Sequence, residues 1–205
     1  QTNLLVEGFY TILDDVFALR DMDDAADGGK VKERYNGSGA TVRGFNVEGR
    51  AAFTRWFELQ AGVTLQQSRY KEPEFWSEDA EVPPVRRMFR TPDAYGYFTA
   101  SFKPVRNFTA DLSGTCTGSM LVQHMAGSGV AQDVAVSTPS FFDMNIRLSY
   151  DVRIYKEITM QLYGGVQNLF NAYQKDFDKG VDRDSGYIYG PSLPRSWFVG
   201  AKFSF

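Results

Sequence analysis

Apolar and polar side chains alternate with a period of two along several segments of this chain. The clearest segment runs from residue 142 to 152, where every even position is apolar and every odd position is polar. Segments 57–66 and 158–167 repeat the pattern, with Tyr163 and the glycines as the only departures. Because successive side chains of a strand point to opposite faces, each segment is predicted to be a strand with one apolar, uncharged face.

The alternation predicts eight strands whose connections alternate between tight and long. The strands are expected over residues 3–18, 40–53, 57–70, 94–102, 108–124, 141–153, 158–174 and 195–205. The tight connections are 54–56, 103–107 and 153–157, and the long ones are 19–39, 71–93, 125–140 and 171–194. Proline cannot donate to a strand ladder, and all eight prolines fall in loops, turns or strand approaches.

This alternation of connections is typical of a transmembrane β-barrel, in which short turns face the periplasm and long loops face outward. The sequence therefore predicts an all-β fold: an antiparallel transmembrane β-barrel segment of about eight up-and-down strands. For any single strand, a soluble β-sandwich is the competing interpretation. The whole set favours the barrel, because many strands exceed the usual length of about 5–6 residues.

The segment 196–205 shows the same two-faced pattern where the chain ends. Trp197, Val199, Ala201, Phe203 and Phe205 share one parity, and no charge falls on it. Such a strand would place an apolar face against lipid and an aromatic ring at the interface.

Composition excludes several other classes. The mean hydropathy is −0.33, and no apolar run approaches the length of a membrane-spanning helix. Aromatic residues make up 15% of the chain, which fits the girdles of a barrel. The net charge of −3 gives no basic field for nucleic acid, and the single cysteine, Cys116, excludes an internal disulfide.

Two segments near the end resemble TonB-dependent outer-membrane receptors. Residues 167–173 read Gln-Asn-Leu-Phe-Asn-Ala-Tyr, which is similar to the penultimate strand of that family. Residues 189–195 read Tyr-Gly-Pro-Ser-Leu-Pro-Arg and lead into the aromatic strand 197–205, which resembles the final strand. Arg90-Thr-Pro92 before the strand at Ala94 is also familiar from receptor barrels, and the loops are similar in style to those of Bacteroidetes-type receptors.

The resemblance implies that residues 1–205 are the C-terminal part of a larger barrel of about twenty-two strands. The plug domain and the N-terminal strands of such a receptor lie outside this chain. By resemblance, the function is TonB-energised uptake of a scarce, bulky nutrient such as an iron-siderophore, cobalamin or haem. The implied partners are the TonB complex, outer-membrane lipid, the nutrient, the barrel-assembly machinery with Phe205 as its assembly signal, and a surface lipoprotein.

Nothing in the sequence indicates an enzyme. There is no nucleophile elbow, no phosphate-binding glycine loop and no His/Cys spacing for a metal. The one histidine, His124, could serve a catalytic triad only if a carboxylate held it, and its neighbours in sequence offer none.

Two sets of residues in the long loops are candidate binding sites. An acidic run offers carboxylates at alternate positions, a ligand type that suits a hard cation such as calcium, although the spacing does not match a known calcium loop and turn formation in a solvated loop is the simpler explanation. The candidate calcium residues are Asp176, Asp178, Asp182 and Asp184. Aromatic and arginine side chains are usual anchors of a ligand, or else pack the loops on each other. The candidate ligand-binding residues are Trp76, Arg86, Arg87, Tyr187 and Tyr189.

Charged residues on the polar parity are expected to face the interior of the barrel. They are Glu48, Arg50, Glu58, Asp111, Asp143, Arg147 and Asp151. A complete eight-stranded barrel with a structural or adhesion role is the alternative to a receptor fragment. Such a barrel would have a side-chain-filled interior, and Gly44, Gly62, Gly165 and Gly200 on the inward parity would leave it thin.

Overall fold

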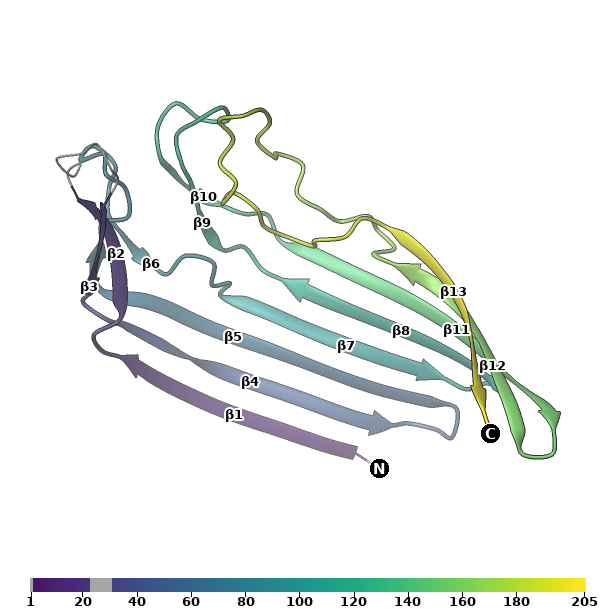
Figure 1. Ribbon diagram of the computed structural model, residues 1–205. Coiled ribbons are helices and arrows are strands. Elements are labelled where there is room, and N and C mark those ends of the chain that lie inside the picture. The colour runs from purple at the N-terminus through teal and green to yellow at the C-terminus, as the bar shows by residue number, and fades with distance from the viewer. Residues whose placement is uncertain (1, 23–30) are drawn as a thin grey trace.

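Eight long antiparallel strands follow one another across a single sheet (Figure 1). The computed structural model describes residues 2–22 and 31–205. The order across the sheet is β1-β4-β5-β7-β8-β11-β12-β13. Each of these eight strands therefore pairs with the one that comes before it in this series, and the series follows the order of the chain. The bounds are β1 (Thr2–Leu13), β4 (Ala40–Ala52), β5 (Phe57–Glu74), β7 (Ala94–Phe102), β8 (Phe108–Thr117), β11 (Phe141–Tyr155), β12 (Ile158–Gln167) and β13 (Ser196–Ser204). This up-and-down antiparallel arrangement confirms the predicted fold class.

Five short strands extend from the end of the sheet at which the long connections lie (Figure 1). They are β2 (Phe17–Met22), β3 (Val31–Asn36), β6 (Val85–Arg87), β9 (Leu121–His124) and β10 (Val134–Ser137). β2 pairs with β3, β9 pairs with β10, and β6 pairs with the last part of β5. The tight connections 53–56, 103–107 and 156–157 lie at the other end of the sheet.

The register separates the two parities into two faces, as the alternation predicts. One face, called the outward face, carries aligned apolar residues such as Leu112, Ile146 and Val166. Many of its side chains are exposed, with Val199 at 90% and Phe45 at 65% of their full accessible area, whereas Val166 is buried at 6%. An apolar face left uncovered over so much of a sheet fits contact with lipid.

The opposite, inward face is polar and internally hydrogen-bonded. Arg50 pairs with Glu58, and the side chain of Gln161 bridges Arg147 and Asp151 through bonds of 3.1 and 2.9 Å. The guanidinium of Arg147 also lies 4.5 Å from the ring centroid of Tyr163. The register places all seven charged residues expected inside on this face.

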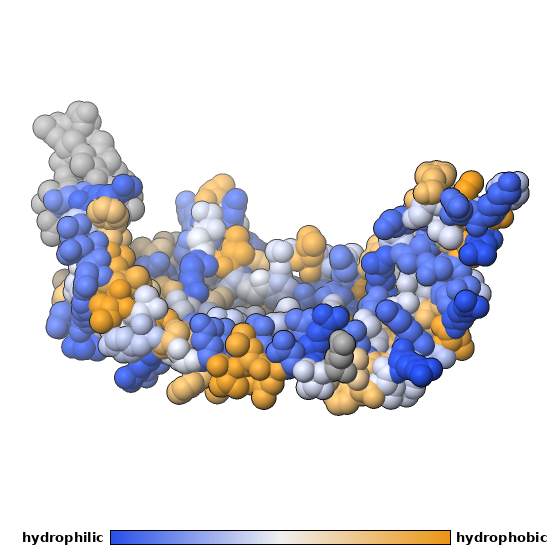
Figure 2. Space-filling view, turned by 90° about the horizontal axis from the view of Figure 1, so that it is seen from below, coloured by the Kyte–Doolittle hydropathy of each residue, from blue (hydrophilic) through white to orange (hydrophobic). Residues whose placement is uncertain are grey.

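The sheet is curved into an open trough (Figure 2). Apolar side chains gather along its convex side, and hydrophilic ones along the hollow side. Within the part of the chain that the structure describes, no pairing joins β1 to β13, and no helix is long and apolar enough to cross a membrane.

Three strands end earlier than the sequence predicts. The strand expected over 3–18 stops at Leu13, before Asp15 takes a left-handed conformation with φ of 51°, and Phe17 begins the separate β2. The strand expected over 108–124 stops at Thr117, because the backbone amide of Gly118 bonds the carbonyl of Ala94 at 2.8 Å and the chain then enters the separate β9. The strand expected over 158–174 stops at Gln167, where Asn168 takes a left-handed conformation with φ of 49°. The Asn168 side chain then bonds the backbone of Ala172 in both directions, at 2.8 and 2.9 Å, which holds a turn in place of a strand.

Candidate functional site

Three long connections pack together at one end of the sheet and form what we call the loop layer. They are the β5–β7 connection (75–93), the β8–β11 connection (118–140) and the β12–β13 connection (168–195). Arg90 contacts the other two connections. Its backbone amide donates to the carbonyl of Leu121 at 2.7 Å, and its guanidinium donates to the carbonyls of Gly186 and Ile188.

A buried histidine–carboxylate pair joins the second and third connections. The Nε2 atom of His124 lies 3.0 Å from both carboxylate oxygens of Asp178. The ring of Tyr187 stacks on the imidazole, with centroids 3.7 Å apart and an interplanar angle of 4°. The hydrogen bond with His124 lowers the pKa of the Asp178 carboxyl, which keeps it charged at neutral pH.

A second carboxylate, Asp176, accepts hydrogen bonds from two tyrosines. The hydroxyls of Tyr187 and Tyr189 donate to it at 2.7 and 2.5 Å. Burial, followed by the bond to Asp176, raises the pKa of Tyr189 to about 12, so its hydroxyl stays protonated and keeps donating. The amide of the fully buried Gln174 bonds the carbonyl of Tyr187 and the backbone amide of Tyr189, at 3.1 and 2.9 Å.

The five candidate ligand-binding residues lie in three places. Tyr187 and Tyr189 lie together but are only 3% and 7% exposed, so their rings pack the loop layer. Arg86 and Arg87 lie on β6, where Arg87 bonds the carbonyl of Ser119 at 2.7 Å and the carboxylate of Asp93 at 3.1 Å. A role for these residues in ligand binding stays a prediction.

Trp76 lines a hollow rich in aromatic residues beside the loop layer. The hollow, of about 210 Å³, lies between the β2–β3 hairpin, the last part of β5, and β9. Phe17, Tyr70, Phe75 and Phe89 also line it, together with the polar Glu74 and Gln123. The indole of Trp76 meets the ring of Phe89 edge-on, with centroids 5.4 Å apart. This arrangement offers flat apolar surfaces and one carboxylate to a small ligand group.

The four candidate calcium residues each make hydrogen bonds with different protein groups. Asp176 and Asp178 are engaged as described, Asp184 accepts from the backbone amide of Met125 at 2.8 Å, and Asp182 offers its carbonyl to Ser128. Within residues 2–22 and 31–205, no group of three or more His, Cys, Asp or Glu side chains is placed to hold a metal ion. Calcium binding by this run stays a prediction.

Sequence reasoning missed the residues that build the loop layer. His124, Gln174 and Arg90 meet partners more than ten residues away in sequence, and no local pattern indicates these contacts. Phe205, the predicted assembly signal, follows β13 on the outward parity and is 93% exposed.

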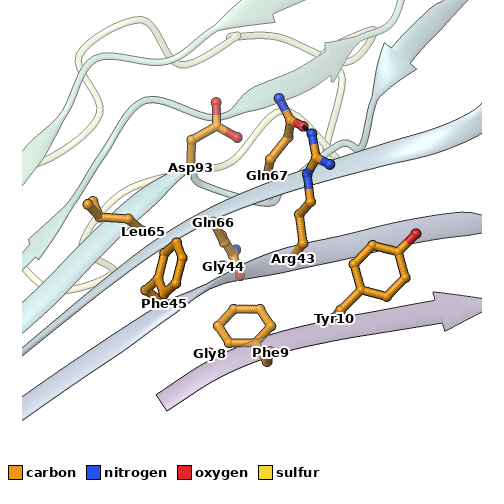
Figure 3. A pocket seen from close by; sticks show the side chains of 10 residues that line it. All are labelled: Gly8, Phe9, Tyr10, Arg43, Gly44, Phe45, Leu65, Gln66, Gln67 and Asp93. Atoms are coloured by element: carbon orange, nitrogen blue, oxygen red, sulfur yellow. Dashed lines mark hydrogen bonds between the residues drawn. The ribbon is translucent and has the colours of Figure 1, made fainter. Parts of the chain in front are cut away.

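A further hollow of about 630 Å³ lies over β1, β4 and β5 (Figure 3). Tyr10, Arg43, Phe45, Leu65 and Gln67 are among the residues around it, and the guanidinium of Arg43 donates to the amide oxygen of Gln67 at 2.8 Å. Residues of both parities line it: Phe9, Gly44 and Gln66 belong to the inward parity, and the charged lining residues are Arg43 and Asp93.

Comparison with known proteins gives matches among solved structures. No protein-family model matches this chain, and no curated protein does. The ferric-catecholate import receptor Fiu from E. coli K12 superposes with a TM-score of 0.64 at 19% identity, over 98% of this chain and 25% of its own. The copper transporter OprC gives 0.64 at 14%, over 100% and 29%. The outer membrane transporter YddB from Escherichia coli gives 0.57 at 12%, over 98% and 29%.

These likenesses show the fold. The chain has the fold of a portion of the barrel of outer-membrane receptors and transporters, which agrees with the fold that the sequence resemblance implies. The chain spans between a quarter and a third of the length of these structures.

Proposed function

We propose that this chain forms part of the barrel wall of a TonB-energised outer-membrane uptake receptor. The observation that carries the proposal is the two-faced, up-and-down sheet, which superposes over almost its whole length on the barrels of a ferric-catecholate import receptor and a copper transporter. The outward face meets lipid and the inward face lines the interior. The cargo is a scarce, bulky nutrient, such as an iron-siderophore, cobalamin or haem.

The remainder of the barrel and a plug domain are supplied by other parts of the same receptor. Two observations support this division. The outer edges of β1 and β13 have no partner strand among the described residues, and an open edge in lipid leaves backbone groups unsatisfied. The matched structures are also three to four times longer than this chain.

The loop layer faces the outside of the cell and the tight turns face the periplasm. Long outer loops and short periplasmic turns are the rule in such barrels. In this orientation the hollow at Trp76 and the exposed Arg86 meet incoming nutrient. The TonB complex, the barrel-assembly machinery acting on Phe205, and a surface lipoprotein are the partners that the proposal implies.

Growth with a defined nutrient source tests the proposal. The intact receptor is expressed in a bacterial host that lacks its own uptake receptors. The host is then supplied in turn with ferric siderophores or haem as sole iron source, or with cobalamin. We expect growth on one class of nutrient, and loss of that growth when TonB is deleted. Growth that is the same with and without TonB, or no growth on any source, would contradict the proposal.

A further inference from the structure

The outward face changes from apolar to basic at one level of β4 and β5. The register aligns Gly8, Phe45 and Leu65 in one apolar row, and Tyr10, Arg43 and Gln67 in the next row toward the loop layer. Phe45, Leu65 and Tyr10 are 65%, 55% and 62% exposed. The change in polarity is abrupt, because the row of Tyr10, Arg43 and Gln67 lies directly beside the apolar row of Phe45 and Leu65.

A second arginine lies one row further toward the loops. Thr41 aligns with Arg69 on the same face, and Arg69 aligns with Arg87. Arg87 is paired with Asp93, but among the described residues no carboxylate lies in salt-bridge range of Arg43 or Arg69. Rows on one face are two residues apart, so the Cα atoms of these two arginines lie in rows separated by about 7 Å.

The basic rows lie at the depth where a lipid headgroup would be. An aromatic cluster of Phe53, Phe57 and Phe102 marks the opposite boundary of the outward face, with the rings of Phe57 and Phe102 stacked at 4.6 Å. From Phe57 to Gln67, β5 advances by ten residues, or about 33 Å. At a strand tilt of about 40° this is a height of about 25 Å, which equals the apolar band of an outer-membrane barrel.

Two hollows continue down the same strands. The hollow in Figure 3 is lined by Arg43 and by the rings of Tyr10 and Phe45, and Asp93 also lines it. A second hollow, of about 470 Å³, lies where Gly49, Ala51 and Ala61 leave space between Leu4 and Val63. Phe53 also lines it, so it lies in the half of the apolar band that is further from the basic rows.

We infer that the outward face of β4 and β5 binds a phosphorylated glycolipid of the outer leaflet. Arg43 and Arg69 bind its phosphate groups, and the acyl chains lie over the apolar rows that begin with Phe45 and Leu65. Guanidinium groups bind phosphate through paired hydrogen bonds. The Tyr10 hydroxyl and the Gln67 amide offer hydrogen bonds to sugar hydroxyls beside the phosphates. This inference rests on the proposed location of the chain in the outer membrane.

Native mass spectrometry of the intact receptor in detergent tests this inference. The probes are bisphosphorylated lipid A, lipid A from which both phosphates have been removed, and phosphatidylglycerol. The variant is Arg43→Gln with Arg69→Gln. The matched control is Arg55→Gln, which removes a positive charge from the tight turn 53–56 at the opposite boundary.

We expect bisphosphorylated lipid A to remain bound to the receptor and to the Arg55→Gln control. The double variant should bind it about tenfold or more weakly, since hydrogen bonds to two charged groups are lost. Lipid A without phosphates should bind equally weakly to all three proteins. The comparison of lipid A with and without phosphates changes only the lipid, so it tests the inference even if the double variant assembles poorly.

Two results would overturn the inference. One is equal retention of lipid A by the double variant and the parent receptor. The other is binding of phosphatidylglycerol as tight and as dependent on Arg43 and Arg69 as that of lipid A. The growth assay distinguishes these results from a failure of the proposed function. A receptor that imports its nutrient in a TonB-dependent way but shows either result disproves only the lipid site.

Discussion

His124 and Asp178 are separated by 54 positions in the chain, yet the imidazole Nε2 atom lies 3.0 Å from both oxygens of the carboxylate. Both side chains are almost fully buried, at 8% and 4% exposure. A hydrogen bond of this kind joins the β8–β11 and β12–β13 connections more firmly than backbone contacts alone, because one partner is charged.

We expect the pH dependence of the loop layer to follow Asp178. Its pKa is lowered from the ordinary value of 3.8, so its contribution to stability is complete above that value and is lost as pH falls through the folded-state pKa. Hydrogen exchange of residues 120–125 and 176–189 should therefore be protected at pH 5 to 7 and lose protection below about pH 4. Asp178→Asn should speed this exchange by about tenfold at neutral pH and remove the acid step. Asp182→Asn, on the same connection, serves as the control and should leave both unchanged.

The two faces should tolerate a new charge very differently. Ile146 lies on the outward face between Leu112 and Val166, whereas Thr99 is exposed on the inward face beside Gln60. Ile146→Arg should destabilise the intact receptor by about 2–4 kcal/mol, because a cation near mid-strand would contact lipid. Thr99→Arg should be close to neutral. Heat-modifiable gel migration measures the folded fraction of each variant, and equal losses would contradict the assignment of the faces.

The orientation of the barrel can be tested with single cysteines. Val181 is 94% exposed in the β12–β13 connection, and Arg55 lies in a tight turn. In cells carrying the intact receptor, a membrane-impermeant maleimide should label Val181→Cys and should label Arg55→Cys only after the outer membrane is opened. Cys116 is exposed on the outward face and is first replaced by serine. Labelling of Arg55→Cys in intact cells would reverse the orientation.

Glycine is required at some inward positions and replaceable elsewhere. A Cβ atom at Gly165 would collide with the carbonyl oxygen of Ile146 on the neighbouring strand, whereas one at Gly49 would meet its nearest atoms at 3.8 Å. Gly165→Ala should lower the free energy of unfolding by about 1–3 kcal/mol, because the backbone of β11 or β12 must shift. Gly49→Ala should change it by less than about 0.5 kcal/mol. Urea unfolding of the intact receptor in detergent micelles gives both values.

The long strands could be predicted because their pattern is local. β7 runs over residues 94–102 as the alternation indicates, and β4 differs from its prediction by one residue. The ends of β8 and β12 could not be predicted, since they depend on the bond of Gly118 to Ala94 and on the left-handed turn at Asn168. The strands β6, β9 and β10 are only three or four residues long, too short for a period to be visible.

The candidate site was predicted only in part. Residue type indicates Tyr187 and Tyr189 as candidates, but the sequence does not show that Asp176 and Gln174 hold both tyrosines in a buried position. The sequence around His124 offers no carboxylate, because its partner Asp178 is 54 positions away in the chain. Long-range contacts of this kind are set by how the connections fold over one another.

Arg90 joins the three connections of the loop layer to one another. Its backbone amide is bonded to the second connection and its guanidinium to the third. No one of these connections can swing away from the mouth of the barrel unless bonds to both of the others break at the same time. In the proposed receptor, a ligand that displaces one connection would therefore also break its bonds to the other two.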